Sequence, residues 1–159
     1  MKIREVMTPN PACCTPDTSL REVAEMFVEY DCGAVPVVDN RESMRTLGIV
    51  TDRDIACRAI AKGVNALELT ARDCMSSPGV TVRAEESLDA AITAMEENRV
   101  RRLIVVDELG GCCGILSQAD VALKAPKRKT AEVVRELSEP TLGPSAVGER
   151  PFAETTHSH

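Results

Sequence analysis

The strongest constraint on the fold is an internal repeat. Ser19 and Leu20 recur 68 positions later as Ser87 and Leu88. The other matched pairs are Met7 with Met75, Asp39 with Asp107, Gly48 with Gly114, Thr51 with Ser117, and Asp54 with Asp120. The last three pairs are 66 positions apart, so the second copy has a loop that is two residues shorter. A repeat of this length predicts two copies of one supersecondary unit that share a hydrophobic core.

Each copy has the sequence pattern of a short unit of strands and helices. In the first copy, Ser19 and Glu22 have the spacing of a capping box, and the apolar residues after them recur at helical spacing. The runs at 35–39 and 103–107 are short, apolar and rich in β-branched residues, which is typical of buried strands. A polar turn, a second strand and another helix follow in each copy. The sequence therefore predicts a duplicated β-α-β-β-α unit of the α/β (α+β) class.

The two copies are expected to occupy residues 1–62 and 73–125, joined by a linker at 63–72. The composition changes in the remaining segment, 126–159. Three basic residues precede a short predicted helix at 130–137, and then Pro, Gly, Ser, Thr and Glu dominate. A segment of that composition buries too little apolar surface to fold, so we expect disorder in about the last twenty residues.

The composition narrows the kinds of ligand and partner. Hydrophobic residues make up 43% of the chain and aromatic residues only 2%, so aliphatic side chains must form both the core and any wall that contacts a ligand base. No stretch reaches the roughly 20 apolar residues that a membrane span needs, and we expect a cytoplasmic protein. The net charge is −6 with basic and acidic residues interspersed, which argues against a general affinity for nucleic acid.

The sequence gives little support for catalysis or for a metal site. The two histidines, His157 and His159, lie in the tail, so no histidine is expected beside a cysteine to activate it. The seven cysteines are an odd number without a Cys-x-x-Cys spacing, which argues against a disulfide framework and a zinc site. We expect buried, reduced thiols and neither catalytic nor metal-binding residues. Redox sensing through Cys112 and Cys113 is the alternative.

The most informative segment is 48–54, which recurs at 114–120 as glycine, two aliphatic residues, a hydroxyl residue, two variable residues and aspartate. One interpretation is structural, because a strand followed by a capping box uses the same hydroxyl and acid. The other is a ligand site. A hydroxyl and free amides at a helix start attract phosphate, while the carboxylate can accept hydrogen bonds from both vicinal hydroxyls of a ribose. The recurrence in both copies favours a site for a nucleoside phosphate.

Residues 1–125 as a whole resemble a pair of cystathionine-β-synthase (CBS) domains. The matching segments are 6–9, 33–39 and 48–54, and their counterparts from Cys74 and Met75 to Asp120. The resemblance implies two half-domains packed pseudo-symmetrically through their sheets into one module with two clefts. It also implies an adenosine ligand, since such modules commonly bind AMP, ADP, ATP or S-adenosylmethionine. Modules of this family often pair into a disc-shaped homodimer.

Carried over by position, the resemblance makes Asp54 and Asp120 the ribose ligands, and Thr51 and Ser117 the hydroxyls near the ribose or phosphate. The adenine base is expected between the strand segment before each long helix and the start of the strand after it. The residues implied there are Thr15, Ala34, Val35 and Pro36 in the first copy, and Thr81, Val82 and Leu103 in the second.

The two copies differ in their cations. Arg101 and Arg102 stand where the first copy has Gly33 and Ala34, so the first copy would rely on Arg53. The arginine pair can be a solvated cluster that compensates nearby glutamates. Two guanidinium groups beside a cleft can instead clamp phosphate oxygens, and on this interpretation we expect tighter phosphate binding in the second copy.

The sequence therefore predicts a regulatory, energy-sensing module that binds an adenine nucleotide and modulates a partner protein, rather than an enzyme. The sequence does not identify that partner. The alternative function is a structural dimerisation module without a physiological ligand.

Overall fold

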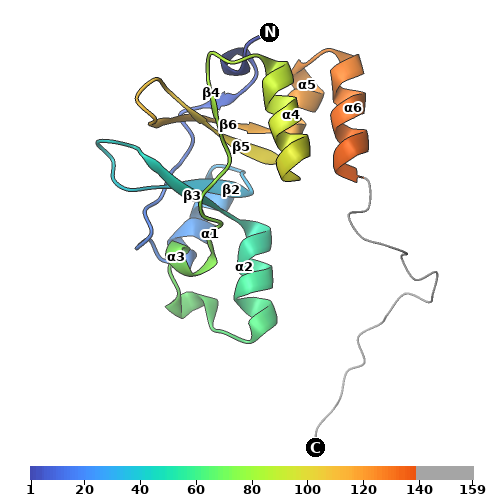
Figure 1. Ribbon diagram of the computed structural model, residues 1–159. Helices are drawn as coiled ribbons and strands as arrows, with labels where there is room; N and C mark the ends of the chain where they lie inside the picture. The colour runs from blue at the N-terminus through green and yellow to red at the C-terminus, as the bar shows by residue number, and fades with distance from the viewer. Residues whose placement is uncertain (139–159) are drawn as a thin grey trace, which may run out of the picture.

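The computed structural model describes residues 1–138, so the segment predicted to be disordered lies outside the described residues. The first part of the chain forms η1 (Ile3–Glu5), β1 (Thr8–Pro9), α1 (Leu20–Glu29), β2 (Ala34–Val38), β3 (Thr46–Thr51) and α2 (Asp52–Arg58). A connection follows through η2 (Ile60–Lys62), η3 (Ala66–Glu68) and α3 (Ala71–Cys74). The second part forms β4 (Thr81–Arg83), α4 (Leu88–Asn98), β5 (Arg102–Val106), β6 (Cys112–Ser117), α5 (Gln118–Lys124) and α6 (Lys127–Ser138) (Figure 1).

The predicted duplication of an α/β unit is confirmed, and the long helices begin where their caps predict. The Oγ of Ser19 accepts a hydrogen bond from the Glu22 amide at 3.2 Å, and the Oγ of Ser87 accepts one from the Ala90 amide at 3.2 Å. Each hydroxyl satisfies an amide that has no partner inside its helix. The helix expected at 130–137 is also present, as the longer α6.

The sheets repeat the same pairing in both halves. In the second half, β4 runs parallel to β5, β6 is antiparallel to β5, and β1 adds to β6 in antiparallel fashion. In the first half, β2 and β3 form an antiparallel pair. In place of the two outer strands of the second half, this pair has single bridges: Cys14 pairs in parallel with Val37 of β2, and Ser76 pairs antiparallel with Ile49 of β3. Each half is therefore one sheet with helices against it.

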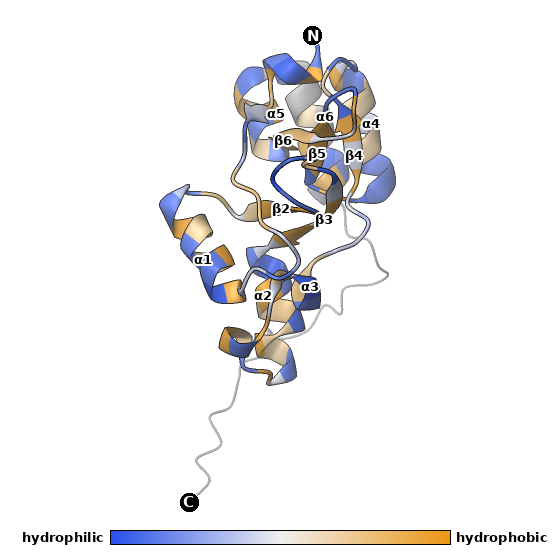
Figure 2. Cartoon of the chain, turned by 90° about the vertical axis from the view of Figure 1, so that its left-hand side faces the viewer, coloured by the Kyte–Doolittle hydropathy of each residue, from blue (hydrophilic) through white to orange (hydrophobic). Residues whose placement is uncertain are grey.

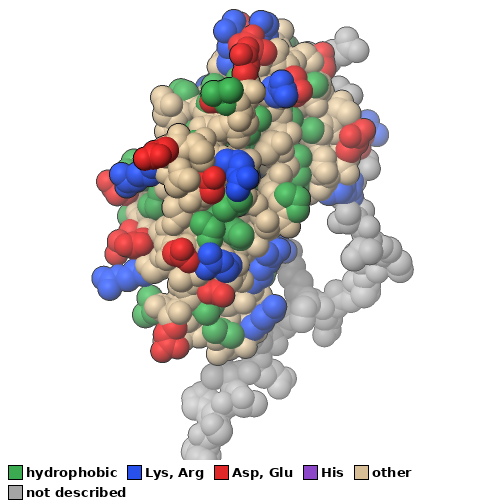
Figure 3. Space-filling view, turned by 60° about the vertical axis from the view of Figure 1, so that its left-hand side comes forward, with side chains coloured by type: hydrophobic (Ala, Val, Ile, Leu, Met, Phe, Trp, Pro, Cys, Tyr) green, Lys and Arg blue, Asp and Glu red, His purple; other side chains and the backbone are tan. Residues whose placement is uncertain are grey.

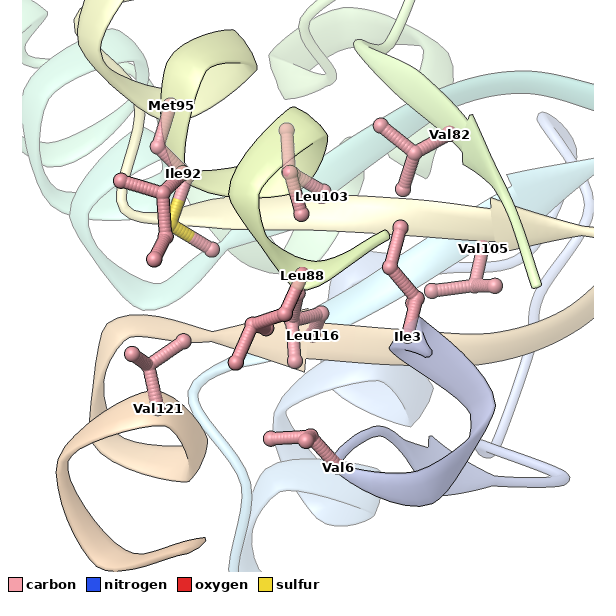
Figure 4. Close-up of a cluster of buried hydrophobic side chains, with 11 residues drawn as sticks. Ile3, Val6, Val82, Leu88, Ile92, Met95, Leu103, Val105, Leu116 and Val121 are labelled. Atoms are coloured by element: carbon pink, nitrogen blue, oxygen red, sulfur yellow. The ribbon is translucent and has the colours of Figure 1, made fainter. Parts of the chain in front are cut away.

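The two halves exchange the segments that lead into them. Ile3 and Val6 precede the first copy, yet they are fully buried in the core of the second half with Leu88 and Leu103 (Figure 4). Residues 68 positions later do the reverse: α3 precedes the second copy, and its Ala71 and Cys74 are buried in the core of the first half. Neither core is complete without a segment from the other side of the repeat.

A basic side chain holds each exchanged segment by its backbone. Arg58, at the end of α2, donates from Nη1 to the carbonyl oxygens of Cys74 at 3.1 Å and Met75 at 2.7 Å. The matching residue of α5, Lys124, donates from Nζ to the carbonyl oxygen of Val6 at 3.0 Å. These carbonyls lie at repeat-equivalent positions, so the two halves use the same clamp with different cations.

A third apolar cluster joins the two sheets. Val38, Ile104 and Cys112 are buried together, with Ile49 and Cys13 packed against them. The hairpin loops meet beside this cluster, since Arg45 bridges to Gly111 and the amide of Cys112 donates to the carbonyl oxygen of Met44 at 2.8 Å. The sheet-to-sheet contact that the family resemblance implies is thus made by both strands and loops.

Hydropathy follows this layering. Figure 2 shows hydrophobic residues concentrated on the strands, while the helices alternate between hydrophobic and hydrophilic residues. In residues 1–138, no helix is long and apolar enough to cross a membrane.

Replacing Gly48 by alanine should destabilise the protein by about 1–3 kcal/mol, the usual cost of overpacking a filled site. The added Cβ would collide with the backbone carbonyl oxygen of Ser76, which belongs to the exchanged segment. Gly114→Ala is the matched control: its Cβ would meet chiefly the Sδ of Met7, the movable end of a side chain, so a smaller loss is expected. Urea denaturation measures both, and a wild-type stability for Gly48→Ala would contradict the close approach.

Candidate functional site

Two open clefts lie along the boundary between the halves. The first cleft, of about 790 Å³, contains Thr51, Arg53 and Asp54 of the β3–α2 junction. The second cleft, of about 570 Å³, contains Ser117 and Asp120 of the β6–α5 junction. The repeated hydroxyl and aspartate thus lie in equivalent clefts, one in each half.

Each cleft is built from three parts of the chain. In the first cleft, the Thr51–Asp54 junction is joined by Ser76 of the exchanged segment and by 99–102, the turn between α4 and β5. In the second cleft, the Ser117–Asp120 junction is joined by Thr8 of the other exchanged segment and by 30–34, the turn between α1 and β2. Both clefts therefore need the junction of one copy and the helix–strand turn of the other copy.

The structural interpretation of the repeated motif holds in full, because both capping boxes are formed. The Thr51 amide donates to Oδ2 of Asp54 at 2.9 Å, and the Asp54 amide donates to Oγ1 of Thr51 at 3.1 Å. In α5, the Ser117 amide donates to Oδ2 of Asp120 at 2.8 Å, and the Asp120 amide donates to the Ser117 Oγ at 3.0 Å. The Ser117 hydroxyl also donates to Oδ2 at 2.8 Å. The hydroxyl and one carboxylate oxygen in each box are therefore engaged within the protein.

The other oxygen of each carboxylate is more weakly held. Oδ1 of Asp54 lies 3.9 Å from Nε of Arg58, and Oδ1 of Asp120 accepts a long hydrogen bond of 3.4 Å from the hydroxyl of Thr8. Both aspartates are half-buried and line their clefts. This oxygen has unused capacity to accept a hydrogen bond from a molecule in the cleft.

Arginine side chains give the clefts different electrostatics. Arg53, Arg99, Arg101 and Arg102 line the first cleft, against the two aspartates 52 and 54. The second cleft shares only Arg101 and Arg102, against aspartates 31 and 120. The face of the molecule in Figure 3 shows basic and acidic side chains interspersed with hydrophobic ones, without a large patch of one sign. The first cleft has an excess of positive charge, whereas the arginines and aspartates of the second cleft balance.

The arginine pair, which the sequence assigned to the second copy's site, also contributes to the other cleft. Arg101 and Arg102 line both clefts. The reason is that β5 begins at the boundary: Arg102 pairs in register with Ser117, while Nη2 of the same arginine reaches across to Gly33 of the first half. Gly33 leaves room for that guanidinium, since a Cβ there would lie 3.1 Å from it. The excess of arginine falls on the first cleft and not on the second.

The residues expected to contact an adenine base are only partly brought together. Ala34 lines the second cleft. Val35, Pro36, Val82 and Leu103 are buried in the sheets instead. Neither Thr15 nor Thr81 is among the residues that line the two described clefts. Alternation along a strand explains the difference, because neighbouring residues face opposite sides of a sheet.

Several residues that line the clefts were not among those expected. They include Thr8, Tyr30, Asp31, Ser76, Pro78, Gly79, Arg99, Gln118 and Leu137. Thr8 and Ser76 had a signal in the sequence, since each directly follows a methionine of the matched pair Met7 and Met75. Their pairing with the other half could not be inferred from that match. Leu137 lies on α6, outside the repeat.

Comparison with known proteins identifies the family. The family model for the CBS domain matches residues 3–59 and 71–126, so the chain belongs to the CBS domain family, with two copies in tandem. Domains of this family are generally regulatory rather than catalytic.

Two relatives span much of the chain. The sequence is 32% identical over 123 residues to the uncharacterized protein MK0525 of Methanopyrus kandleri, over 77% of this chain and 59% of that protein. This chain thus spans well under two thirds of the length of that relative. It is 28% identical over 137 residues to Hypoxic response protein 1 of Mycobacterium tuberculosis, over 86% of this chain and 94% of that protein.

Solved structures share the fold. Hypoxic Response Protein I, solved with two coordinated zinc ions, has a TM-score of 0.69 at 29% identity, over 79% of this chain and 100% of that chain. CBSX2, solved in complex with AMP, has a TM-score of 0.65 at 28% identity, over 78% and 95%. The CBS domain pair of protein MJ0100, solved with 5′-methylthioadenosine and S-adenosyl-L-methionine, has a TM-score of 0.69 over 77% and 98%, and its 23% identity shows the fold alone.

The part of this chain that the structure describes contains no group of three or more His, Cys, Asp and Glu side chains that could hold a metal ion.

Proposed function

We propose that this protein is a regulatory module that binds an adenosine compound, AMP, ADP, ATP or S-adenosylmethionine, in the clefts between its two halves. The observation that carries the proposal is the repeated aspartate in each cleft, which has one weakly held carboxylate oxygen outside its capping box, beside arginines that both clefts share. Binding would modulate a partner protein, and the module itself would catalyse no reaction. CBSX2 and MJ0100, which share the fold, were solved with adenosine compounds.

The ribose is assigned to the aspartates. Oδ1 of Asp54 and Oδ1 of Asp120 are the acceptors left over from the capping boxes, and vicinal hydroxyls are donors that a carboxylate can pair with. The hydroxyls of Thr51 and Ser117 already accept from the helix amides, so they contribute mainly by orienting the carboxylates.

The phosphate is assigned to the arginines. A guanidinium group donates two parallel hydrogen bonds to phosphate oxygens, and four arginines surround the first cleft. The capping boxes occupy the amides of Asp54 and Asp120, which weakens the case for the helix starts as the main phosphate ligands. A compound with several phosphates is therefore expected to prefer the first cleft.

The base is assigned to aliphatic walls. Ile49, Val80 and Ile104 line the first cleft, and Ile115 and Ala34 line the second. A flat adenine ring can bury its faces against such side chains, while backbone groups read its edge. Tyr30 adds an aromatic ring to the second cleft alone, so the clefts are also expected to differ in how they hold the base.

Replacing Asp54 or Asp120 by asparagine should weaken binding of AMP or ATP in the affected cleft by about 1.5–3 kcal/mol, the range for a hydrogen bond to a charged group. Asparagine keeps an acceptor for the capping box, so the fold should be retained. Calorimetry measures affinity and circular dichroism checks the fold, with Glu42→Gln, an exposed charge on the β2–β3 loop, as the control. If no adenosine compound binds the wild-type protein, the structural dimerisation alternative is favoured.

The arginines separate the two clefts experimentally. Arg53→Ala with Arg99→Ala should weaken ATP binding in the first cleft alone, by about tenfold, whereas Arg101→Ala with Arg102→Ala should weaken it in both. Adenosine is the control ligand, because it has no phosphate for these groups to meet. The losses should grow at low salt, where screening is least. Equal losses for adenosine and ATP would show that the arginines act on cleft shape.

We also propose a homodimer through the outer face of α1 and η3. A groove of about 610 Å³ on this face is lined largely by apolar atoms of Leu20, Ala24, Val28, Ile55, Ala66 and Leu67. Val28 is 84% exposed and Leu67 is 70% exposed. Neighbouring apolar side chains this exposed are typical of a protein–protein contact.

Placing glutamate at both Val28 and Leu67 should convert the dimer to a monomer in sedimentation velocity, because two charges would be buried without partners at the contact. Leu109→Glu is the matched control, since Leu109 is 97% exposed on the β5–β6 turn and should leave the dimer intact. A wild-type protein that sediments as a monomer, with and without nucleotide, would contradict this proposal.

A further inference from the structure

Two thiols face each other across the boundary between the halves. Cys13 lies on the segment between β1 and α1 of the first half, and Cys112 begins β6 of the second half. Their Sγ atoms are 3.9 Å apart. Both belong to the apolar cluster that joins the two sheets, and Cys13 remains half-buried while Cys112 is 8% exposed. A disulfide bond requires this distance to close from 3.9 Å to roughly 2.05 Å.

The surroundings give the two sulfurs different reactivity. The contact between the two sulfurs lowers the pKa of Cys13, against the opposing effects of burial and of neighbouring Cys14. The same contact raises the pKa of Cys112, and burial raises it further. The thiolate is the form that attacks a disulfide, so Cys13 is the nucleophile and Cys112 the second thiol.

The cysteines next to this pair in the sequence, Cys14 and Cys113, point away from the contact. Cys112 and Cys113, adjacent in sequence, face opposite sides of β6: Cys112 lies in the cluster between the sheets, and Cys113 packs against the core of the second half. The same alternation turns Cys14 into the core of the first half, where burial raises its pKa to about 12. Redox chemistry through Cys112 therefore points to Cys13 as its partner rather than to Cys113.

We propose that Cys13 and Cys112 are the site of an intramolecular disulfide that locks the two halves of the module together. The oxidant is a small disulfide, RSSR. The Cys13 thiolate attacks it, forming a mixed disulfide with R and releasing one RSH after protonation. Cys112 then loses its proton and attacks the Cys13 sulfur, which forms the protein disulfide and releases the second RSH. Two protein thiols are oxidised by two electrons, and RSSR is reduced to two RSH.

The position of the bond determines what it can do. Cys112 and Ser117 are at opposite ends of β6, so the bond lies roughly 17 Å from the second cleft's capping box, at about 3.4 Å per strand residue. It would leave the cleft walls unoccupied. It would instead tie the first half, just before α1, to the strand that carries the second half's binding junction. Oxidation would thus stabilise the contact between the two halves, and this effect does not depend on nucleotide binding in the clefts.

The test is to treat the full-length reduced protein with oxidised glutathione, block free thiols by alkylation, and map peptides without reduction. We expect a Cys13–Cys112 cross-link within one chain and a melting temperature higher by roughly 5–15 °C, reversed by dithiothreitol. Cys112→Ser should stop the reaction at a glutathione adduct on Cys13, and Cys13→Ser should prevent the cross-link. Cys57→Ser is the control, because Cys57 is exposed on α2 and should not matter.

The proposal is overturned if the peptide map of the wild-type protein shows Cys13 and Cys112 both still alkylated after Cys57 has formed a glutathione adduct. It is also overturned if either thiol pairs instead with another cysteine, within the chain or between two chains. The wild-type map decides these outcomes even if a serine variant fails to fold, so the result does not depend on the variants.

Discussion

The exchange of the leading segments is the interaction on which the rest of the structure depends. Ile3 and Val6 complete the core of the second half, and Ala71 and Cys74 complete that of the first. Half of this repeat could not bury its apolar surface alone, because an essential part of its core belongs to the other half. The exchange also places a backbone segment against β3 at Gly48 and another against β6 at Gly114, and at Gly48 a Cβ would collide with backbone. Folding of one half therefore requires that of the other.

The same exchange creates the clefts. Each cleft contains an exchanged segment, a capping-box junction and a turn from the opposite copy, so a molecule bound there contacts both halves at once. Binding that requires both halves in their native arrangement stabilises that arrangement. Sequence divergence within the repeat then makes the clefts unequal. The turn at 99–102 has arginines at three positions where the first copy has aspartate, glycine and alanine.

Local sequence patterns predicted the helices and strands, but they did not predict the contacts between residues far apart in the sequence. The caps Ser19 and Ser87 and the strand runs were visible because periodicity and capping act within a few residues. The capping boxes at Thr51 and Ser117 and their place in two clefts followed from the repeat. The exchange could not be predicted, because Ile3 fits the core of either copy equally well by composition. Arg102 was assigned to one cleft for the same reason: position in the sequence does not reveal which half its side chain reaches.

The position of Leu137 has a consequence for the end of the chain. This residue of α6 packs against the core of the second half and also lines the first cleft. A molecule that contacts Leu137 in the first cleft would help to hold α6 against the core. The coupling is reciprocal: if docking of α6 raises the affinity for the molecule by some factor, the bound molecule favours docking of α6 by the same factor. Occupancy of the first cleft would thereby be coupled to the docking of α6, without any rearrangement of the two sheets.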